Sequence, residues 1–503
     1  MPAVPGLLDP CLFRQLAYLD GKWVYGEGAQ RDLAVTNPAT LEVLGHVPML
    51  SASQVDAAIA AADRAFATWC ELGIERRTEL LERWHRLILE HREDLARLIT
   101  LEQGKPLNDA RGEIDYAASF VKWFAEEGRR AYGETIPSHI PGASLGTVKE
   151  PVGVAALITP WNFPLAMITR KAAAALAAGC TVVVKPANET PFIALALAEL
   201  AERAELPSGT FNVVTGDAPM VAGRLCSDPR VMALSFTGST RVGRLLLAQC
   251  ADSVKRVSLE LGGNAPFIVC ADIDPDLAAE AAIAAKFQTS GQDCLAANRI
   301  FVHRSIYEPF IERFVERMLK LKLGNGFDQV ELGPLIHRRA VEQAEALVED
   351  AVARGARLYG SDQTRAPGPN FFVPALLADV TPAMRVFREE SFNPVAAVCA
   401  YDDEETLLRD ANDTEYGLAA YVYGRDLACV RRLVRGLRFG MVSVNSVKMT
   451  GPPVPFGGVK QSGLGREGGR AGLEEYLATK YVCISDPPGT CQSAANRDST
   501  GDL

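Results

Sequence analysis

The chain has 503 residues, of which 48% are hydrophobic and 23% charged, the balance of a globular protein. This length exceeds what one ordinary hydrophobic core organises, so two or three domains are expected. The formal net charge of −10 argues against nucleic-acid partners and anionic membrane surfaces, because both are bound by basic faces.

Targeting and metal signals are missing from the sequence. No apolar run reaches the roughly 18 residues of a membrane span, and residues 1–15 lack the basic region that opens a signal peptide. The eleven cysteines form no CxxC pair, and the six histidines form no ligand-spaced cluster with them. We therefore expect a cytoplasmic protein with reduced thiols, no metal site and no membrane association.

The first part of the chain predicts helices and then a hairpin. Residues 53–123 are rich in Ala, Leu, Glu and Arg at helical spacing, which is typical of amphipathic helices. Residues 129–147 are rich in Gly and Pro, which predicts a protruding hairpin.

From Pro151 onward, short apolar runs alternate with helical segments. The expected strands cover 152–160, 181–186, 211–214 and 231–238, and the expected helices cover 168–180, 192–206 and 239–251. Such alternation predicts a parallel sheet with helices on both faces. A second alternating block, 265–444, predicts a second α/β domain, with the active site in the cleft between the two. The polar, turn-rich residues 486–503 predict a disordered tail.

Three residue types needed for acyl chemistry occur in distinctive surroundings. Cys294 lies in KFQTSGQDCLAANR, where Gly291 permits a sharp turn; Glu260 lies in LELGG, and Asn162 in TPWNFP. A thiol, a carboxylate and an amide supply a nucleophile, a base and an oxyanion donor. Each residue alone is more often structural: an inert core thiol, a surface glutamate or a loop asparagine.

The residues that follow two of the expected strands are of types that can contact a nucleotide. Residues 236–243, FTGSTRVG, join a strand to a helix whose free N–H groups suit a pyrophosphate, although the segment is not a GxGxxG motif. Lys185 and Asn188 follow another strand, where they can hydrogen-bond a ribose. In isolation, a plain turn and a surface lysine are the commoner explanations. Arg170 and Lys171 are expected near the start of a helix, where positive charge opposes the helix dipole.

The motifs ITPWNFP, KPA, FTGST, ELGG, GQxC, EExFxP and PFGGxKxSGxGRE follow one another in this order. Over roughly residues 19–484 the chain resembles the NAD(P)-dependent aldehyde dehydrogenase superfamily, and WNFPLAMITRKAAAALAAGC and VPFGGVKQSGLGREGG look most like succinate-semialdehyde dehydrogenases. The resemblance implies an α/β fold of two doubly wound parallel-sheet domains plus a small β oligomerisation element, assembled as a homodimer or homotetramer. The implied parts are a dinucleotide-binding domain (1–128, 148–260 and 454–473), a catalytic domain (261–453), the oligomerisation element (129–147 and 474–490) and a tail (491–503).

The resemblance also implies the residue roles. Cys294 attacks the aldehyde, Asn162 and the Cys294 backbone N–H hold the oxyanion, hydride passes to the nicotinamide, and Glu260 activates the water that hydrolyses the thioester. Lys171 and Glu467 match positions that help to relay protons.

For the cofactor, the resemblance implies NAD, with NADP tolerated. Asn188 stands where NAD-preferring relatives often carry Glu, so hydrogen bonding is kept while repulsion of a 2′-phosphate is lost, although Glu189 restores some negative field. Phe392 is followed by Asn393-Pro394 instead of the usual Gly-Pro, a mild departure. The implied cofactor residues are Thr159, Pro160, Trp161, Lys185, Asn188, Gly238, Ser239, Gly243, Gly262, Glu390 and Phe392.

The substrate pocket departs from the family pattern. Succinate-semialdehyde enzymes hold the distal carboxylate with two arginines; one matches Arg170, but the other position is Gln288. Asp293, where relatives usually have Thr or Val, is expected to repel a carboxylate and to raise the thiol pKa. Lys448 is a candidate for the missing cation, although a solvated loop lysine is the commoner role. The implied substrate residues are Phe163, Arg170, Gln288, Asp293, Lys448 and Phe456.

The expected substrate is therefore a small-molecule aldehyde: a semialdehyde anchored by Arg170, or an aldehyde with a polar or aromatic body. Ala296 replaces the second cysteine that some relatives carry, which excludes a local disulfide there. Three alternatives stay open: a CoA-acylating dehydrogenase, a non-catalytic scaffold and a γ-glutamyl-phosphate-type reductase. Glu260 argues against the first and third, because neither needs a hydrolytic base.

Overall fold

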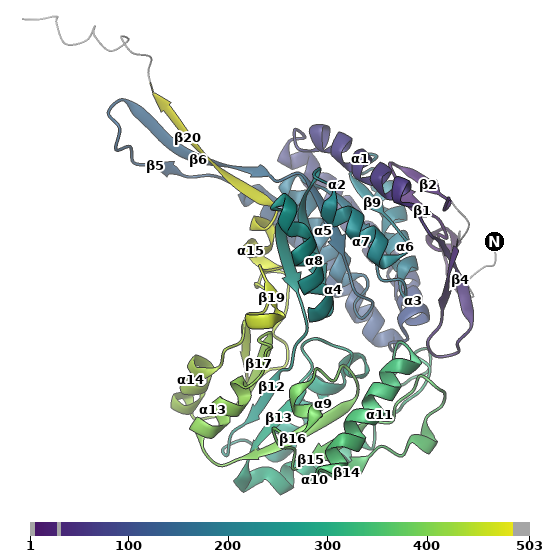
Figure 1. The fold of residues 1–503 in the computed structure, drawn as a ribbon, viewed down its shortest axis with the longest axis vertical. Helices are drawn as coiled ribbons and strands as arrows, with labels where there is room; N and C mark the ends of the chain where they lie inside the picture. The colour runs from purple at the N-terminus through teal and green to yellow at the C-terminus, as the bar shows by residue number, and fades with distance from the viewer. Residues whose placement is uncertain (1–5, 28–31, 486–503) are drawn as a thin grey trace, which may run out of the picture.

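The computed structural model describes residues 6–27 and 32–485, and the predicted tail at 486–503 lies outside them. The upper body in Figure 1 is built on an eight-stranded sheet of order β19-β11-β10-β7-β8-β9-β1-β2. Its five central strands, from β11 to β9, run parallel, and β19, β1 and β2 join antiparallel. The strands are β1 Ala17–Leu19, β2 Lys22–Val24, β7 Val154–Ile158, β8 Thr181–Lys185, β9 Phe211–Val213, β10 Val231–Thr237, β11 Arg256–Glu260 and β19 Gly463–Leu464.

Helices cover both faces of this sheet because its strands are apolar on both sides. Val182 and Val184 of β8 pack into a core with α2 to α6, whereas Val183 between them packs with α1, α7 and α8. The helices are α1 Ala52–Trp69, α2 Ile74–Glu90, α3 Arg92–Gln103, α4 Leu107–Glu127, α5 Ala166–Ala178, α6 Pro191–Arg203, α7 Ala218–Ser227, α8 Thr240–Cys250 and α15 Gly469–Glu474.

The lower body in Figure 1 holds a seven-stranded sheet of order β14-β15-β16-β13-β12-β17-β18, parallel except for β14. Ile268 packs into one core and its neighbours Phe267 and Val269 into another, so helices cover this sheet on both faces too. The strands are β12 Pro266–Val269, β13 Arg299–His303, β14 Arg357–Gly360, β15 Ala375–Ala378, β16 Val395–Tyr401, β17 Ala419–Tyr423 and β18 Met441–Val444. The helices are α9 Pro275–Phe287, α10 Tyr307–Met318, α11 Arg338–Ala353, α12 Arg385–Arg388, α13 Glu404–Asn412 and α14 Leu427–Gly436.

A three-stranded antiparallel sheet projects from the upper body in Figure 1, and we call it the arm. It consists of β5 Thr135–Ile136, β6 Ala143–Pro151 and β20 Leu477–Ser485, so the hairpin predicted from 129–147 is confirmed. A separate hairpin joins β3 Asp32–Thr36 to β4 Val43–Pro48. Short 3-10 helices cover Pro10–Leu12, Gly128–Arg130, Ala251–Ser253, Gln288–Gly291, Arg304–Ile306, Gln363–Arg365 and Lys460–Ser462.

The two bodies are joined where β11 ends. Glu260 is the last residue of β11, and the chain enters β12 of the second sheet six residues later, at Pro266. The chain returns when Leu464 of β19 pairs with Leu259 of β11. The α/β fold with two helix-covered, mostly parallel sheets, predicted from strand–helix alternation, is confirmed. Among the described residues, no helix is long and apolar enough to cross a bilayer.

Candidate active site

Cys294 follows a backbone turn that few residue types accept. Helix α9 ends at Phe287, and Thr289, Ser290 and Gly291 then have φ of 49°, 55° and 75°. A Cβ at Gly291 would lie 2.3 Å from the carbonyl oxygen of Asn393, so only glycine fits there. The sharp turn predicted at Gly291 is confirmed.

Hydrogen bonds from a neighbouring loop hold this turn in place. The Ser290 hydroxyl accepts a bond from Gly333 N at 3.0 Å, and Gln292 Oε1 accepts one from Ile336 N at 2.9 Å. The carbonyl oxygen of Cys294 lies 2.2 Å from where a Cβ of Gly263 would stand. The nucleophile loop therefore packs directly against the segment that leaves β11.

The Cys294 side chain is half-buried and lines a cavity of about 1460 Å³. Burial raises the pKa of the thiol well above its usual range, and the carboxylates of Asp293 and Glu390 raise it further. A thiol in this environment is neutral at rest, so a base must remove its proton before it can act as a nucleophile.

Asn162 contacts the nucleophile loop from the other body. It lies between β7 and α5, is buried, and its Nδ2 donates to the carbonyl oxygen of Gln292 at 3.0 Å. Its own carbonyl oxygen accepts a bond from Lys105 Nζ at 2.7 Å. The amide donor is thus fixed two residues from Cys294, where it can meet charge that develops on a bound carbonyl oxygen.

Glu260 is a buried carboxylate without a hydrogen-bond partner on either oxygen among the described residues. Burial raises its pKa well above the usual range, and the nearby Glu467 raises it further. Its Oε1 lies 2.8 Å from where a Cβ of Gly457 would stand, so the carboxylate is pressed against backbone on that side. An unsatisfied buried carboxylate with a raised pKa is suited to take a proton from a water molecule.

A buried ionic cluster of Glu467, Arg170 and Lys171 lies close to Glu260. Glu467 Oε2 is 2.5 Å from Arg170 Nε, and its Oε1 pairs with Lys171, which also donates to Thr237 Oγ1 at 2.7 Å. Burial alone would raise the pKa of Glu467, but Arg170 and Lys171 bring it below its usual value. The two cations were expected at a helix start; α5 begins at Ala166, which puts them in its second turn, where the dipole cost is smaller.

The adenosine-side candidates lie at the carboxyl ends of β8 and β10 and do not line the Cys294 cavity. Lys185 Nζ donates to Asn188 Oδ1 at 2.8 Å, and burial lowers the pKa of this lysine to about 8. Ser239 is the N-cap of α8 beside Gly238. A Cβ at Gly243 would lie 2.4 Å from Leu261, so this glycine lets α8 pack closely.

The nicotinamide-side candidates come from both bodies. Glu390 Oε1 accepts a bond from Gly263 N at 2.9 Å, and its Oε2 lies 2.7 Å from where a Cβ of Gly262 would stand. Burial raises the pKa of Glu390 to about 7. Phe392 meets Trp161 edge to face, with ring centroids 5.6 Å apart, and Trp161 follows Thr159 and Pro160 at the end of β7.

The substrate candidates share one cavity with the nucleophile: Phe163, Arg170, Gln288, Asp293, Lys448 and Phe456 all line it beside Cys294. Gln288 and Lys448 are exposed, Asp293 is half-buried, and Arg170 and Phe456 are buried. The Arg170 guanidinium stacks on Phe456, 4.1 Å from the ring centroid. Its Nη2 meets only the Met167 thioether, at 3.0 Å, among the described residues. Arg170 therefore retains N–H donors for a ligand in the cavity.

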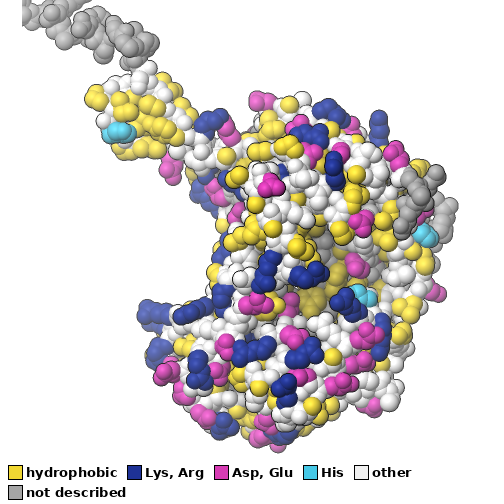
Figure 2. Space-filling model, viewed as in Figure 1, with side chains coloured by type: hydrophobic (Ala, Val, Ile, Leu, Met, Phe, Trp, Pro, Cys, Tyr) yellow, Lys and Arg dark blue, Asp and Glu magenta, His cyan; other side chains and the backbone are white. Residues whose placement is uncertain are grey.

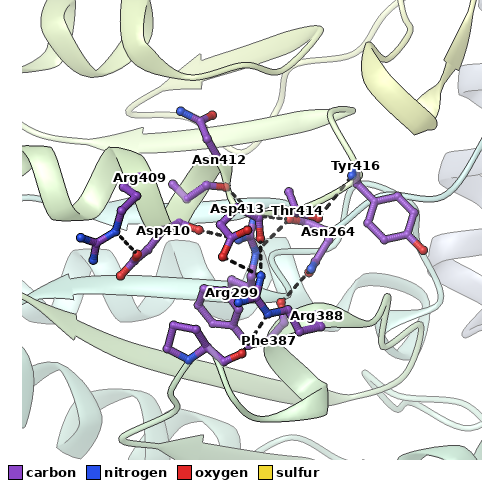
Figure 3. A network of polar contacts seen from close by, with 12 residues as sticks. Asn264, Arg299, Phe387, Arg388, Arg409, Asp410, Asn412, Asp413, Thr414 and Tyr416 are labelled. Carbon is purple, nitrogen blue, oxygen red and sulfur yellow. Dashed lines mark hydrogen bonds and ion pairs between the residues drawn. The ribbon is translucent and has the colours of Figure 1, made fainter.

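Sequence reasoning missed several buried cations that support the site. Arg299, five residues after Cys294, donates to the carbonyl oxygens of Asn264 at 2.9 Å and Asp410 at 3.0 Å, and Figure 3 shows it at the centre of this network. Asp410 belongs to the last turn of α13, where a cation is favourable.

A second buried cation holds the other end of the same loop. Lys286 Nζ donates to Asn298 Oδ1 at 2.7 Å and to Ser391 Oγ at 2.8 Å. Burial lowers the pKa of Lys286 to about 7. The local sequence does not predict these hydrogen-bond partners, because most lysine and arginine side chains are exposed to solvent.

Three comparisons with known proteins agree. Residues 23–482 match the model of the aldehyde dehydrogenase family. The chain is 65% identical to "aspartate-semialdehyde dehydrogenase (non-phosphorylating)" of Halomonas elongata, over 95% of this chain and 97% of that one. It is 52% identical to the succinate-semialdehyde dehydrogenase [NADP(+)] of Escherichia coli strain K12, over 95% and 99%. The crystal structure of aldehyde dehydrogenase from Brucella melitensis biovar abortus 2308 superposes with a TM-score of 0.94 at 48% identity, covering 95% and 99%.

Proposed function

The chain belongs to the aldehyde dehydrogenase family and oxidises a semialdehyde to the carboxylic acid with NAD(P), and we propose that Cys294, Asn162 and Glu260 carry out this reaction. One observation carries the proposal: the Cys294 thiol lies close to an amide donor, Asn162, and to an unsatisfied buried carboxylate, Glu260, whose charge acts on the thiol. The comparisons above confirm the predicted family and activity, while the residue roles are our proposal.

The proposed reaction begins when Glu260 accepts the proton of the Cys294 thiol and the resulting thiolate bonds to the aldehyde carbon. The charge that develops on the carbonyl oxygen is held by Asn162 Nδ2, and removal of one such donor typically costs about 3 kcal/mol of barrier. Bound NAD(P) supplies the acceptor for the hydride that leaves this carbon. The thioester that remains on Cys294 is hydrolysed by a water molecule whose proton Glu260 accepts, and the thiolate leaves. Lys171 and Glu467 are proposed to pass the proton onward from Glu260.

The residues present fit a dinucleotide. Lys185 and Asn188 offer a buried amine and an amide to a ribose, and the N-terminus of α8 at Ser239 offers free N–H groups to a pyrophosphate. Glu390 offers a carboxylate to the nicotinamide ribose. We propose NAD as the cofactor, with NADP accepted, because Asn188 adds no charge that would repel a 2′-phosphate.

The proposed substrate is a four-carbon semialdehyde that carries a carboxylate. The two relatives compared above are named for aspartate semialdehyde and succinate semialdehyde, and both compounds have this skeleton. Arg170 lines the cavity with Nη donors to spare, and Phe456 and Phe163 flank it with aromatic surface. A guanidinium binds a carboxylate well in this setting.

The arm supports a proposed homodimer or homotetramer. Val148, Tyr481 and Ile484 are 42%, 56% and 66% exposed, and Figure 2 shows the hydrophobic surface of the arm standing away from the body. Contiguous apolar surface of this kind is typical of an interface.

A panel of aldehydes, assayed for NAD(P)H formation with each cofactor and with or without CoA, tests the proposal. Replacement of Cys294 by Ser is expected to lower kcat/KM by at least about a thousandfold, because the thioester route is lost. Retention of activity in that variant would refute the role of Cys294. A product that forms only with CoA would favour the CoA-acylating alternative, and no turnover of any aldehyde would favour a scaffold.

A further inference from the structure

We propose that Asp293 is a specificity-determining residue that pairs with an ammonium group on the substrate, so that the preferred semialdehyde is that of an α-amino acid. This inference rests on the proposed function, because it takes Cys294 as the nucleophile. It distinguishes the two four-carbon substrates named above, which differ by one ammonium group in place of a hydrogen.

Asp293 presents an oriented carboxylate beside the reacting sulfur. It immediately precedes Cys294, is half-buried and lines the same cavity. Its Oδ1 accepts a bond from Leu295 N at 2.9 Å, which fixes the carboxylate beside the Cys294 thiol. A carboxylate adjacent to the nucleophile lies within reach of a group two carbons from the bound aldehyde carbon.

The two cations that act on Asp293, Lys105 and Arg170, are already paired elsewhere. Lys105 lies at 2.7 Å from Glu113, both side chains being fully buried, and Arg170 Nε lies at 2.5 Å from Glu467. Among the described residues, Asp293 forms no ion pair. Burial raises the pKa of Asp293, against the opposing effects of Lys105, Arg170 and the hydrogen bonds from Leu295 and Cys294. A ligand cation is therefore the missing partner.

The remainder of the nucleophile loop adds no positive charge to the cavity. Lys286 points at Asn298 and Ser391, and Arg299 points at backbone carbonyls. Gln288 contributes only a neutral amide. A substrate with a carboxylate alone would thus be attracted by Arg170 but repelled by Asp293.

A semialdehyde that carries both an ammonium and a carboxylate group can pair with Asp293 and with Arg170, which both line the cavity. Arg170 has spare Nη donors for the α-carboxylate, and Asp293 accepts from the α-ammonium on the same carbon. With the aldehyde carbon fixed on Cys294, three points of attachment define the hand of the substrate. The structure therefore also favours one enantiomer.

The test compares L-aspartate 4-semialdehyde with succinate semialdehyde on the wild type, on Asp293→Asn and on the matched control Asp328→Asn, whose exposed carboxylate lines the same cavity. The wild type is expected to favour the amino substrate by at least about tenfold in kcat/KM, with a preference for the L over the D enantiomer. In Asp293→Asn the ratio of the two kcat/KM values is expected to fall by about a hundredfold, mainly through KM, while Asp328→Asn keeps the wild-type ratio.

The ratio separates substrate recognition from a general effect on the thiol, because altered Cys294 reactivity changes both substrates alike. An unchanged ratio in Asp293→Asn would overturn the assignment, as would a wild-type preference for succinate semialdehyde, which needs no variant. Failure of the proposed function would look different: neither semialdehyde would be turned over by the wild type. Thermal melting of each variant checks that the fold is retained.

Discussion

At the scale of single residues, the cofactor side of the site depends on a few charges held at strand ends. Lys185 is buried at the end of β8, and its only described side-chain partner is the neutral Asn188, at 2.8 Å. With the pKa of this lysine lowered to about 8 by burial, its charge at neutral pH is available to a ligand. The choice between NAD and NADP is therefore sensitive to the residue at position 188.

Replacement of Asn188 by Glu is expected to raise the KM for NADP by about tenfold or more and to leave NAD little affected. The new carboxylate pairs with Lys185 and repels a 2′-phosphate. Steady-state kinetics with both cofactors measures this, with Asn188→Gln as the control that keeps an amide. An equal effect on both cofactors would place residue 188 away from the 2′ position.

Glu390 is expected to make cofactor binding pH-dependent near neutrality. Burial raises its pKa to about 7, so the carboxylate is lost as pH falls through 7, and with it the acceptor for ribose hydroxyls. The KM for NAD should therefore rise between pH 8 and pH 6, since this range brackets the value of about 7. In Glu390→Gln the same profile should be flat; a wild-type slope that persists in the variant would assign the titration to another group.

At the scale of elements, α4 and α5 are tied together by a buried ion pair that also supports Asn162. Glu113 Oε1 accepts bonds from Leu165 N at 2.9 Å and Ala166 N at 3.2 Å at the start of α5, while its Oε2 pairs with Lys105. Lys105 in turn holds the carbonyl of Asn162. The oxyanion donor is thus positioned by the packing of two helices.

Replacement of Glu113 by Gln is expected to destabilise the protein by about 3 kcal/mol, because Lys105 is left buried without a counter-charge. The activity should also fall, because the Asn162 loop loses part of its support. Urea denaturation and kcat measure the two effects. In the double variant with Lys105→Met, stability should recover in part; a double variant no more stable than the single one would contradict this account.

The sequence predicted the elements better than their buried polar partners. The alternation of TVVVK with helical segments is a local hydrophobic pattern, and it correctly predicted β8 and its helix-covered sheet. The start of α5 was placed two residues late, since Ala166 and Met167 carry no cap signal. Lys105 and Arg299 went unnoticed, because what they contact is fixed only by tertiary packing.

In the candidate site too, local features were predicted from the sequence better than contacts between distant residues. Gly291 was predicted from its own conformational freedom, and its φ of 75° agrees. The convergence of Cys294, Asn162 and Glu260 was expected only from the resemblance to a family, because residues 162 and 294 lie on different bodies. No local sequence pattern predicts a contact between residues that lie so far apart in the sequence.

At the scale of the whole molecule, assembly is expected to depend on the arm. In β20, Tyr481 and Ile484 leave apolar surface exposed, and the arm contacts the body only at its base in Figure 1. A small three-stranded sheet gains stability when its apolar face packs against another surface.

Replacement of Tyr481 and Ile484 together by Asp is expected to shift the protein to a smaller assembly, because two charges would be buried in the interface. Light scattering coupled to size-exclusion chromatography measures the mass. Leu427→Asp, at a residue 60% exposed elsewhere on the surface, is the control and should keep the parent mass. An unchanged mass in the double variant would exclude the arm as the interface.

The left-handed backbone at Thr289 and Ser290 has a consequence for any attempt to make this protein more heat-resistant. Non-glycine residues in that region each cost on the order of 1–3 kcal/mol, which the surrounding contacts must offset. Glycine at either position would remove that cost in the native state. It would also increase the number of conformations open to the turn that positions the Cys294 sulfur. Glycine variants of this turn are thus predicted to be more stable to heat and to have a lower kcat. Selection for thermal stability alone would therefore lower the catalytic activity.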